Sequence, residues 1–121
     1  MAIKGVGIDM IEIERVRTAL ARTPSMHQRL FTADELAHCG DKVGSLAARF
    51  AAKEAVAKAM GSGIRGFAFV DVEIRSDELG RPSVVLHRSA ALVAARAGIQ
   101  HLHLSLTTSD TIAAAYAVAE G

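Results

Sequence analysis

The sequence predicts an α+β fold in which an antiparallel sheet packs on a long helix. Three observations indicate this class: an alternating apolar segment at residues 3–13, an alanine-rich helical segment at residues 45–60, and two alternating runs near the end of the chain that form a hairpin. The chain has 121 residues, and 50% of them are hydrophobic, which is enough for one core. We therefore expect residues 1–121 to form a single domain.

The N-terminal third is predicted to contain one strand and three helices. A helix at residues 12–21 ends before Pro24, a short second helix covers residues 25–30, Thr32 caps a third, and residues 40–44 form a loop. The strand before them, at residues 3–13, is half-buried, and its two faces carry different side chains: Val6, Ile8 and Met10 on one, and Gly5, Gly7, Asp9 and Ile11 on the other.

The longest predicted helix covers residues 45–60, with Ser45 as its N-cap and Gly61 at its end. Residues 61–66 form a flexible loop, and residues 67–75 alternate as a strand. A turn at residues 77–82 leads to a strand at residues 83–87 and to a helix at residues 90–97 that Gly98 ends. Strands at residues 102–106 and 112–119 complete the sheet as a hairpin.

The charge and the cysteine content exclude several classes of protein. The 14 basic and 13 acidic residues give a net charge of +1, whereas a general nucleic-acid binder carries a strong basic excess. Cys39 is the single cysteine, which excludes an internal disulfide and a cysteine-based zinc cluster. No apolar run reaches the ~18 residues of a membrane span, and residues 1–7 lack the apolar stretch of a signal peptide. We expect a cytoplasmic protein with no nucleic-acid or membrane partner.

Asp9 is unusual because it lies inside an apolar strand, between Ile8 and Met10, where aspartate is disfavoured. One explanation is that its face of the strand is exposed to solvent. The other is that the strand holds the carboxylate rigidly for a cation. The strand alone does not decide between these explanations.

The long helix carries two charged pairs at i,i+4 spacing. Glu54 and Lys58 continue a stripe that begins with apolar residues, and they form either an ordinary helical ion pair or part of a site. Arg49 and Lys53 have like charges, so they are either two solvated cations or the two sides of a phosphate site.

Glycines follow the helix at positions 61, 63 and 66, where they would let a ligand approach the backbone. Their spacing matches neither a P-loop nor a dinucleotide-binding motif. Two carboxylates, several cations and a glycine loop together predict a metal–phosphate site. Mg²⁺ suits such a site, because it binds one or two carboxylates together with substrate phosphates.

Two longer motifs resemble those of a known family. Residues 7–15, Gly-Ile-Asp-Met-Ile-Glu-Ile-Glu-Arg, resemble the first signature of the holo-[acyl-carrier-protein] synthases, the small 4′-phosphopantetheinyl transferases. Residues 50–61, Phe-Ala-Ala-Lys-Glu-Ala-Val-Ala-Lys-Ala-Met-Gly, resemble the second signature. The spacing between them, the turn at residues 80–82 and the last hairpin also match, so the resemblance covers essentially the whole chain.

The resemblance implies a Mg²⁺-dependent enzyme that moves 4′-phosphopantetheine from coenzyme A to a serine of apo-acyl carrier protein and releases adenosine 3′,5′-bisphosphate. It places Asp9 and Glu54 at the metal and Lys58 beside the pyrophosphate, and these three are the expected catalytic residues. Members of this length are typically homotrimers with each active site between two subunits, so the resemblance implies a homotrimer here. Contacts with coenzyme A are expected from Arg49, Lys53, Lys58, Gly61, Gly63, Arg81, Pro82 and Thr108.

A basic helix is expected to bind the carrier protein. Residues 15–31 contain four arginines and no acidic residue, and Arg15 and Arg22 are seven residues apart, so they share a helix face. A solvated basic helix has the same pattern. However, acyl carrier proteins are acidic, and the resemblance places Arg15 on the helix that faces them.

The last hairpin departs from the family pattern, because Thr108 stands where histidine is expected. Threonine can donate a hydrogen bond but cannot carry charge, so the resemblance does not extend to an acid–base role there. This departure keeps an alternative open, a non-catalytic trimeric module that binds coenzyme A or a carrier protein. His101 and His103 alternate with leucines and are expected at the surface. The sequence does not distinguish a fatty-acid from a polyketide carrier protein.

Overall fold

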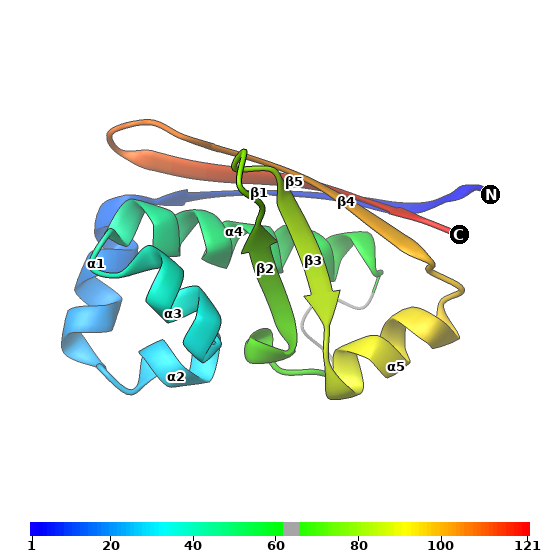
Figure 1. Ribbon diagram of the computed structural model, residues 1–121, viewed down its shortest axis with the longest axis horizontal. Helices are drawn as coiled ribbons and strands as arrows, with labels where there is room; N and C mark the ends of the chain where they lie inside the picture. Colours follow the sequence, from blue (N-terminus) through cyan, green and yellow to red (C-terminus); the bar gives the residue numbers. More distant parts are fainter. Residues whose placement is uncertain (62–65) are drawn as a thin grey trace.

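Helix α4 (Val43–Ala59) is the centre of the fold in the computed structural model, which describes residues 1–61 and 66–121. On one side of α4 lies a three-stranded antiparallel sheet with strand order β1-β5-β4. Figure 1 shows this sheet along the top of the molecule with α4 beneath it. The predicted class is therefore confirmed. The three strands are β1 (Ile3–Glu12), β4 (His101–Thr108) and β5 (Ile112–Glu120).

Shorter elements cover the other side of α4 (Figure 1). Three helices lie toward its N-terminal end: α1 (Ile13–Arg22), α2 (Met26–Leu30) and α3 (Ala33–Cys39). The 3-10 helix η1 (Phe69–Asp71) leads into a two-stranded sheet of β2 (Val72–Ser76) and β3 (Pro82–Leu86). Helix α5 (Arg88–Arg96) connects β3 to β4. Among the described residues, no helix is long and apolar enough to cross a membrane.

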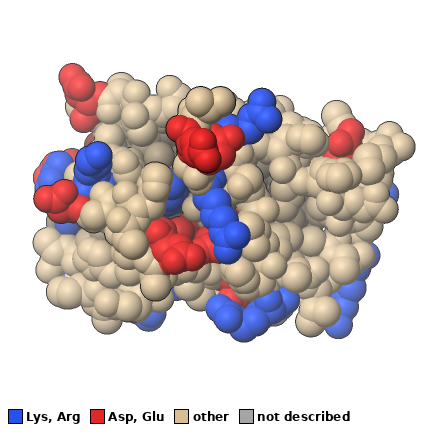
Figure 2. All heavy atoms as spheres, in the orientation of Figure 1, with Lys and Arg blue, Asp and Glu red and all other residues tan. Residues whose placement is uncertain are grey.

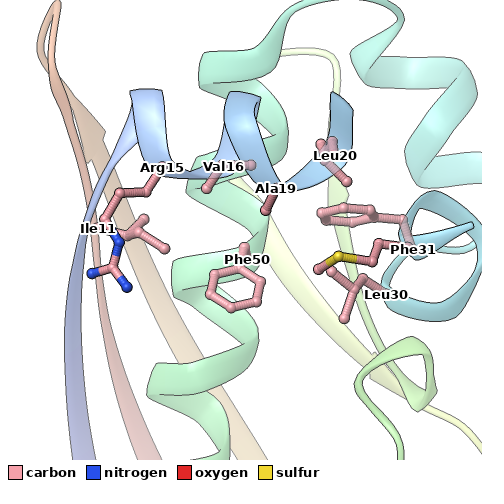
Figure 3. Close-up of a pocket in the computed structure, with 9 residues that line it drawn as sticks. Ile11, Arg15, Val16, Ala19, Leu20, Leu30, Phe31 and Phe50 are labelled. Atoms are coloured by element: carbon pink, nitrogen blue, oxygen red, sulfur yellow. The ribbon is translucent and has the colours of Figure 1, made fainter. Parts of the chain in front are cut away.

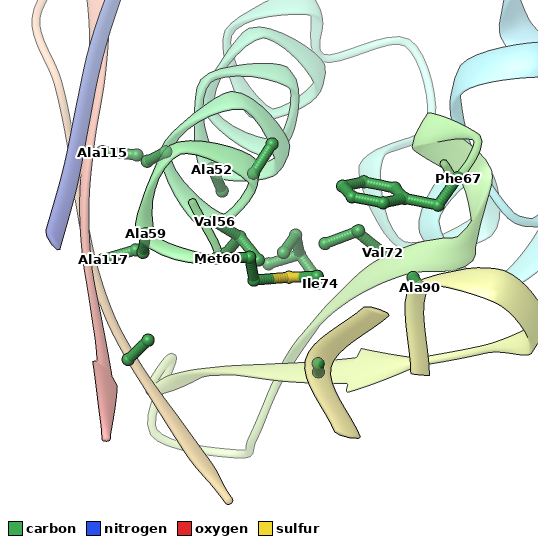
Figure 4. Close-up of a cluster of buried hydrophobic side chains, with 14 of the residues drawn as sticks. Ala52, Val56, Ala59, Met60, Phe67, Val72, Ile74, Ala90, Ala115 and Ala117 are labelled. Atoms are coloured by element: carbon green, nitrogen blue, oxygen red, sulfur yellow. The ribbon is translucent and has the colours of Figure 1, made fainter. Parts of the chain in front are cut away.

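Small residues let α4 pack closely on several elements at once. Six of its alanines are at most 1% exposed, and two hydrophobic clusters meet along the helix. One cluster fills the space between α4, the three-stranded sheet and the β2–β3 hairpin, where Val56 and Met60 lie beside Val72 and Ile74 (Figure 4). The other lies under α1, α2 and α3. The fully buried alanines are Ala47, Ala51, Ala52, Ala55, Ala57 and Ala59.

Two glycines bring β1 against the backbone of α4. A Cβ atom on Gly7 would lie 1.9 Å from the carbonyl oxygen of Ala55, and one on Gly5 would lie 2.1 Å from that of Ala59. No side chain fits in either place, so both positions require glycine because the backbone of α4 is so close. This contact determines which face of β1 turns inward.

The other face of β1 is apolar and exposed. Val6, Ile8 and Met10 are 53%, 60% and 69% exposed, and Tyr116 on the adjacent strand is 45% exposed. Strand β4 adds the polar residues His103 and Ser105 in the same rows of the sheet. The outer surface of the three-stranded sheet, which we call the outer face, is therefore apolar over β1 and β5 and polar over β4.

Several predicted elements need correction. Helix α4 begins at Val43 after Lys42, so Ser45 lies inside the helix and does not cap it. The strand predicted at residues 67–75 is present only from Val72, because Phe69–Asp71 forms η1. The cap on α3 and the last hairpin are confirmed, since Thr32 forms a capping box with Glu35 and β4 pairs with β5.

Candidate active site

Asp9, Glu54 and Lys58 come together where β1 crosses α4. Asp9 follows Gly5 and Gly7 on the inward face of β1, and its side chain is 20% exposed. The Lys58 ammonium donates a hydrogen bond to the carbonyl oxygen of Ile8 at 2.8 Å and lies 3.5 Å from Asp9 Oδ1. Lys58 thus contacts the strand rather than forming an ordinary helical ion pair with Glu54. The explanation that Asp9 lies on a solvent-exposed face of the strand is wrong.

Glu54 is affected by the same neighbours. Burial, and then the negative charge of Asp9, raise the pKa of Glu54, while Lys58 partly opposes that rise. The site therefore holds two carboxylates that repel each other beside one half-exposed ammonium group. A bound cation would relieve the repulsion between the two carboxylates.

The donor set fits Mg²⁺ better than a softer metal. Asp9 and Glu54 offer hard carboxylate oxygens, and Mg²⁺ needs only one or two of these when substrate phosphates and water complete its shell. In the described part of the chain, no three histidine, cysteine or acidic side chains are grouped closely enough to hold a metal by themselves. A metal here would thus take its remaining ligands from water and, when substrate is bound, from its phosphates.

Arg49 and Lys53 lie on a different side of α4 from this cluster. Lys53 is 0% exposed, and its ammonium is held by Glu35 and by two backbone carbonyls, so it offers no donor to a phosphate. The prediction that Lys53 contacts coenzyme A is therefore wrong. Arg49 is 5% exposed and donates from Nη2 to Ser76 Oγ at 3.2 Å, and its buried Nε has no partner among the described residues.

The remaining predicted contacts with coenzyme A are dispersed. Gly61 ends α4 with a φ of +81°, while Gly63 lies outside the described residues. Arg81 is exposed and precedes Pro82 at the β2–β3 turn, and Figure 2 shows charged side chains gathered over this hairpin. Thr108 is exposed at the end of β4. In the described part of the chain, no hydrogen bond or ion pair joins Arg81 or Thr108 to the Asp9 cluster.

Arg15 and Arg22 line one surface groove on α1, with a volume of about 430 Å³. Their predicted common face is confirmed. Beside it, an apolar cavity of about 170 Å³ opens between α1, α2 and α4, and Arg15 also lines it. Figure 3 shows Val16, Leu20 and Phe50 around this space. The sequence did not reveal the cavity, because its walls come from four separate segments.

Comparison with known proteins identifies the family. Residues 5–119 match the sequence profile of the 4′-phosphopantetheinyl transferase superfamily. The chain belongs to this superfamily. The transferase is 47% identical to the holo-[acyl-carrier-protein] synthase of Streptomyces avermitilis, over 100% of both chains. It is 44% identical to that of Clostridium perfringens, over 98% of this chain and 95% of the relative.

Solved structures of similar proteins share the fold of the transferase. The holo-[acyl-carrier-protein] synthase of Neisseria meningitidis superimposes with a TM-score of 0.91 at 34% identity, over 99% of this chain and 100% of the other. The Helicobacter pylori enzyme, in complex with coenzyme A, gives a TM-score of 0.86 at 29% identity, over 95% and 99%. The family predicted from the two motifs is confirmed, and the transferase is an enzyme rather than a passive binding module.

Proposed function

We propose that this transferase is a holo-[acyl-carrier-protein] synthase. It would move 4′-phosphopantetheine from coenzyme A to a serine of an apo-acyl carrier protein and release adenosine 3′,5′-bisphosphate. The observation that carries the proposal is the meeting of Asp9 on β1 with Glu54 and Lys58 on α4. The names of the relatives, which match the chain over nearly its whole length, support the same activity.

Asp9 and Glu54 would hold Mg²⁺, which neutralises pyrophosphate charge when it is bound. Lys58 would bind the departing bisphosphate, because its ammonium is half exposed and its hydrogen bond to the Ile8 carbonyl fixes its position. The serine oxygen forms a bond to the phosphorus next to the pantetheine, and the bond from that phosphorus to the leaving bisphosphate breaks. The serine proton passes to a base, for which Glu54 is our candidate.

The carrier protein would dock on α1. Arg15 and Arg22 would contact the acidic partner from a groove that Glu12 and Glu14 also line, and the apolar cavity beside Arg15 can accept an apolar side chain from the partner. Charge reversal at Arg15 or Arg22 should raise KM for the carrier protein, most strongly at low salt, and leave KM for coenzyme A unchanged. Arg96→Glu, on the exposed surface of α5, is the control.

The outer face supports the expected homotrimer. Exposed apolar side chains on β1 and β5 form a continuous surface that no element of the described chain covers. Two of the most exposed of these side chains, Ile8 and Met10, lie on β1. Subunit contact would also bring dispersed residues such as Arg81 and Thr108 toward the Asp9 cluster of a second subunit.

One assay tests the activity. The protein is incubated with coenzyme A, Mg²⁺ and an apo-acyl carrier protein, and mass spectrometry detects the phosphopantetheine adduct. We expect Asp9→Ala and Glu54→Ala to abolish the adduct without unfolding the protein, whereas Asp41→Ala, in an exposed loop, should react normally. Near-normal rates of Asp9→Ala or Glu54→Ala at saturating Mg²⁺ would contradict the assignment of these ligands.

A further inference from the structure

The Lys53 ammonium group is completely buried and uses all its hydrogen-bond donors. It is 0% exposed, and it donates to Glu35 Oε1 at 2.8 Å, to the carbonyl of Phe69 at 3.2 Å and to the carbonyl of Val72 at 2.5 Å. An ammonium group has three donors, so none is left over. Lys53 thus connects α4 to α3, to η1 and to the start of β2.

The partner carboxylate, Glu35, is equally well satisfied. Its Oε1 accepts a hydrogen bond from the Thr32 amide, and its Oε2 accepts one from the Ile74 amide, both at 2.9 Å. The Thr32 hydroxyl in turn donates to Glu73 Oε2 at 2.7 Å. Loss of one member of such a network leaves a buried charge without a partner, which is strongly unfavourable. The network therefore keeps these elements in one arrangement.

Lys53 and Glu54 leave α4 in different directions. Neighbouring residues of an α-helix are about 100° apart around its axis. Lys53 points toward α3 and β2, whereas Glu54 lies one turn before Lys58, on the side of α4 where Lys58 contacts Asp9. The rotation of α4 about its own axis thus sets both positions together.

On the side that faces β1, apolar packing does little to fix that rotation. Toward β1, the helix presents the backbone at Ala55 and Ala59, and the strand presents Gly5 and Gly7. Helices are held in register when side-chain ridges enter grooves, and glycine and alanine form only shallow ridges. Directional hydrogen bonds on the opposite side of α4 are the stronger constraint.

We propose that Lys53 is a positioning residue: its ion pair with Glu35 sets the rotation of α4 and thereby places the Glu54 carboxylate beside Asp9. This inference rests on the proposed function, which gives these two carboxylates to the metal. An α-helix with its side chains has a radius of about 5–6 Å, so a rotation of about 10° moves a carboxylate on its surface by ~1 Å. A misplacement of that size can lower an enzymatic rate about 100-fold.

The test removes both charges of the pair, so that neither is left buried without its partner. In the double variant Lys53→Met/Glu35→Gln, the amide oxygen at position 35 can accept from the Thr32 amide or from the Ile74 amide, while the NH2 group takes the place of the other acceptor. Val56→Ala is the matched control, because Val56 is also fully buried on α4 and its truncation lowers stability without touching a polar group. Tm, kcat and both KM values are measured. The affinity of the substrate-free protein for Mn²⁺, used as a paramagnetic probe for the Mg²⁺ site, is measured by water-proton relaxation.

We expect the double variant to lower kcat about 10- to 100-fold and to weaken Mn²⁺ binding about tenfold, with KM for the carrier protein nearly unchanged. Val56→Ala, compared well below the Tm of both variants, should keep kcat and Mn²⁺ affinity within about twofold of wild type. Equal losses in the two variants, or wild-type Mn²⁺ affinity in the double variant, would show that Lys53 is only structural.

A second variant keeps the inference testable if the double variant does not fold. Glu35→Asp keeps both charges but shortens the acidic side chain by one methylene group, so the ion pair no longer holds α4 at the same rotation, and it is then judged by the same two criteria. Failure of the proposed function is a separate outcome. A wild-type protein that transfers no phosphopantetheine would overturn the function, whereas the Mn²⁺ measurement still reports whether Lys53 positions the two carboxylates.

Discussion

Gly7→Ala is expected to separate β1 from α4 and to disturb the active site without altering any functional group. The new Cβ would lie 1.9 Å from the carbonyl oxygen of Ala55 and 2.9 Å from the amide nitrogen of Ala59, both of them backbone atoms. Gly7 is not among the glycines with positive φ, so its backbone conformation would accept alanine. The collision is therefore the whole effect of the substitution.

The size of the effect follows from that distance. A carbon–oxygen contact needs ~3.3 Å, so the strand must retreat by roughly 1.4 Å. Overpacking of this kind costs about 1–3 kcal/mol of the free energy of unfolding. The same displacement moves Asp9, two residues further along β1, away from Glu54 and Lys58. We expect kcat to fall by at least about tenfold.

Denaturant unfolding and the transferase assay measure the two effects. Gly44→Ala is the matched control. Gly44 lies within α4, and a Cβ atom there would only touch Ile13 Cδ1, at 3.8 Å. Replacement of a helical glycine by alanine should raise the free energy of unfolding by up to about 1 kcal/mol. If Gly7→Ala were as stable and as active as Gly44→Ala, close packing would not hold the site together.

Three further predictions concern charge and assembly. Burial alone would raise the pKa of Glu73, but hydrogen bonds from Thr32, His87 and Arg75 outweigh burial and lower it. Glu73 should therefore stabilise the fold at pH values above the ordinary glutamate pKa of about 4.3. Glu73→Gln should have a lower free energy of unfolding than wild type at neutral pH, and this difference should disappear as the pH falls below that value. Because the pKa of Glu54 is raised, the acid limb of the plot of kcat/KM against pH should lie above the ordinary glutamate range. More Mg²⁺ should move this limb to lower pH, because the metal competes with the proton for the carboxylate. A limb that Mg²⁺ does not move would exclude Glu54 as a ligand. Ile8→Asp, on the outer face, should give a monomer in light scattering, and an unchanged mass would place the interface elsewhere.

The three charged residues of the candidate site could be predicted because each breaks a local pattern. Asp9 interrupts an apolar strand, and Glu54 and Lys58 continue an apolar stripe. The family resemblance predicted their proximity, whereas the local patterns did not, since it depends on the contact between β1 and α4 at Gly5 and Gly7.

The role of Lys53 was misjudged for a physical reason. Spacing along a helix shows which residues share a face, but it does not show what that face meets. The partner, Glu35, lies 18 residues earlier and also belongs to the capping box of α3. The same lysine explains why residues 69–71 do not form the strand that the sequence predicted. The carbonyl of Phe69 bonds to Lys53, so that segment is satisfied by a side chain rather than by a neighbouring strand.

The alternation of β1 has a consequence for how this enzyme should be handled. Successive residues of the strand face opposite sides of the sheet, with Asp9 on the side of the proposed metal site and Ile8 and Met10 on the side of the proposed subunit contact. If the subunits separate, β1 loses the contacts on its outer face, and the position of Asp9 on its inner face becomes less fixed. Specific activity should then fall on dilution, and a diluted stock should recover only as fast as the subunits reassociate.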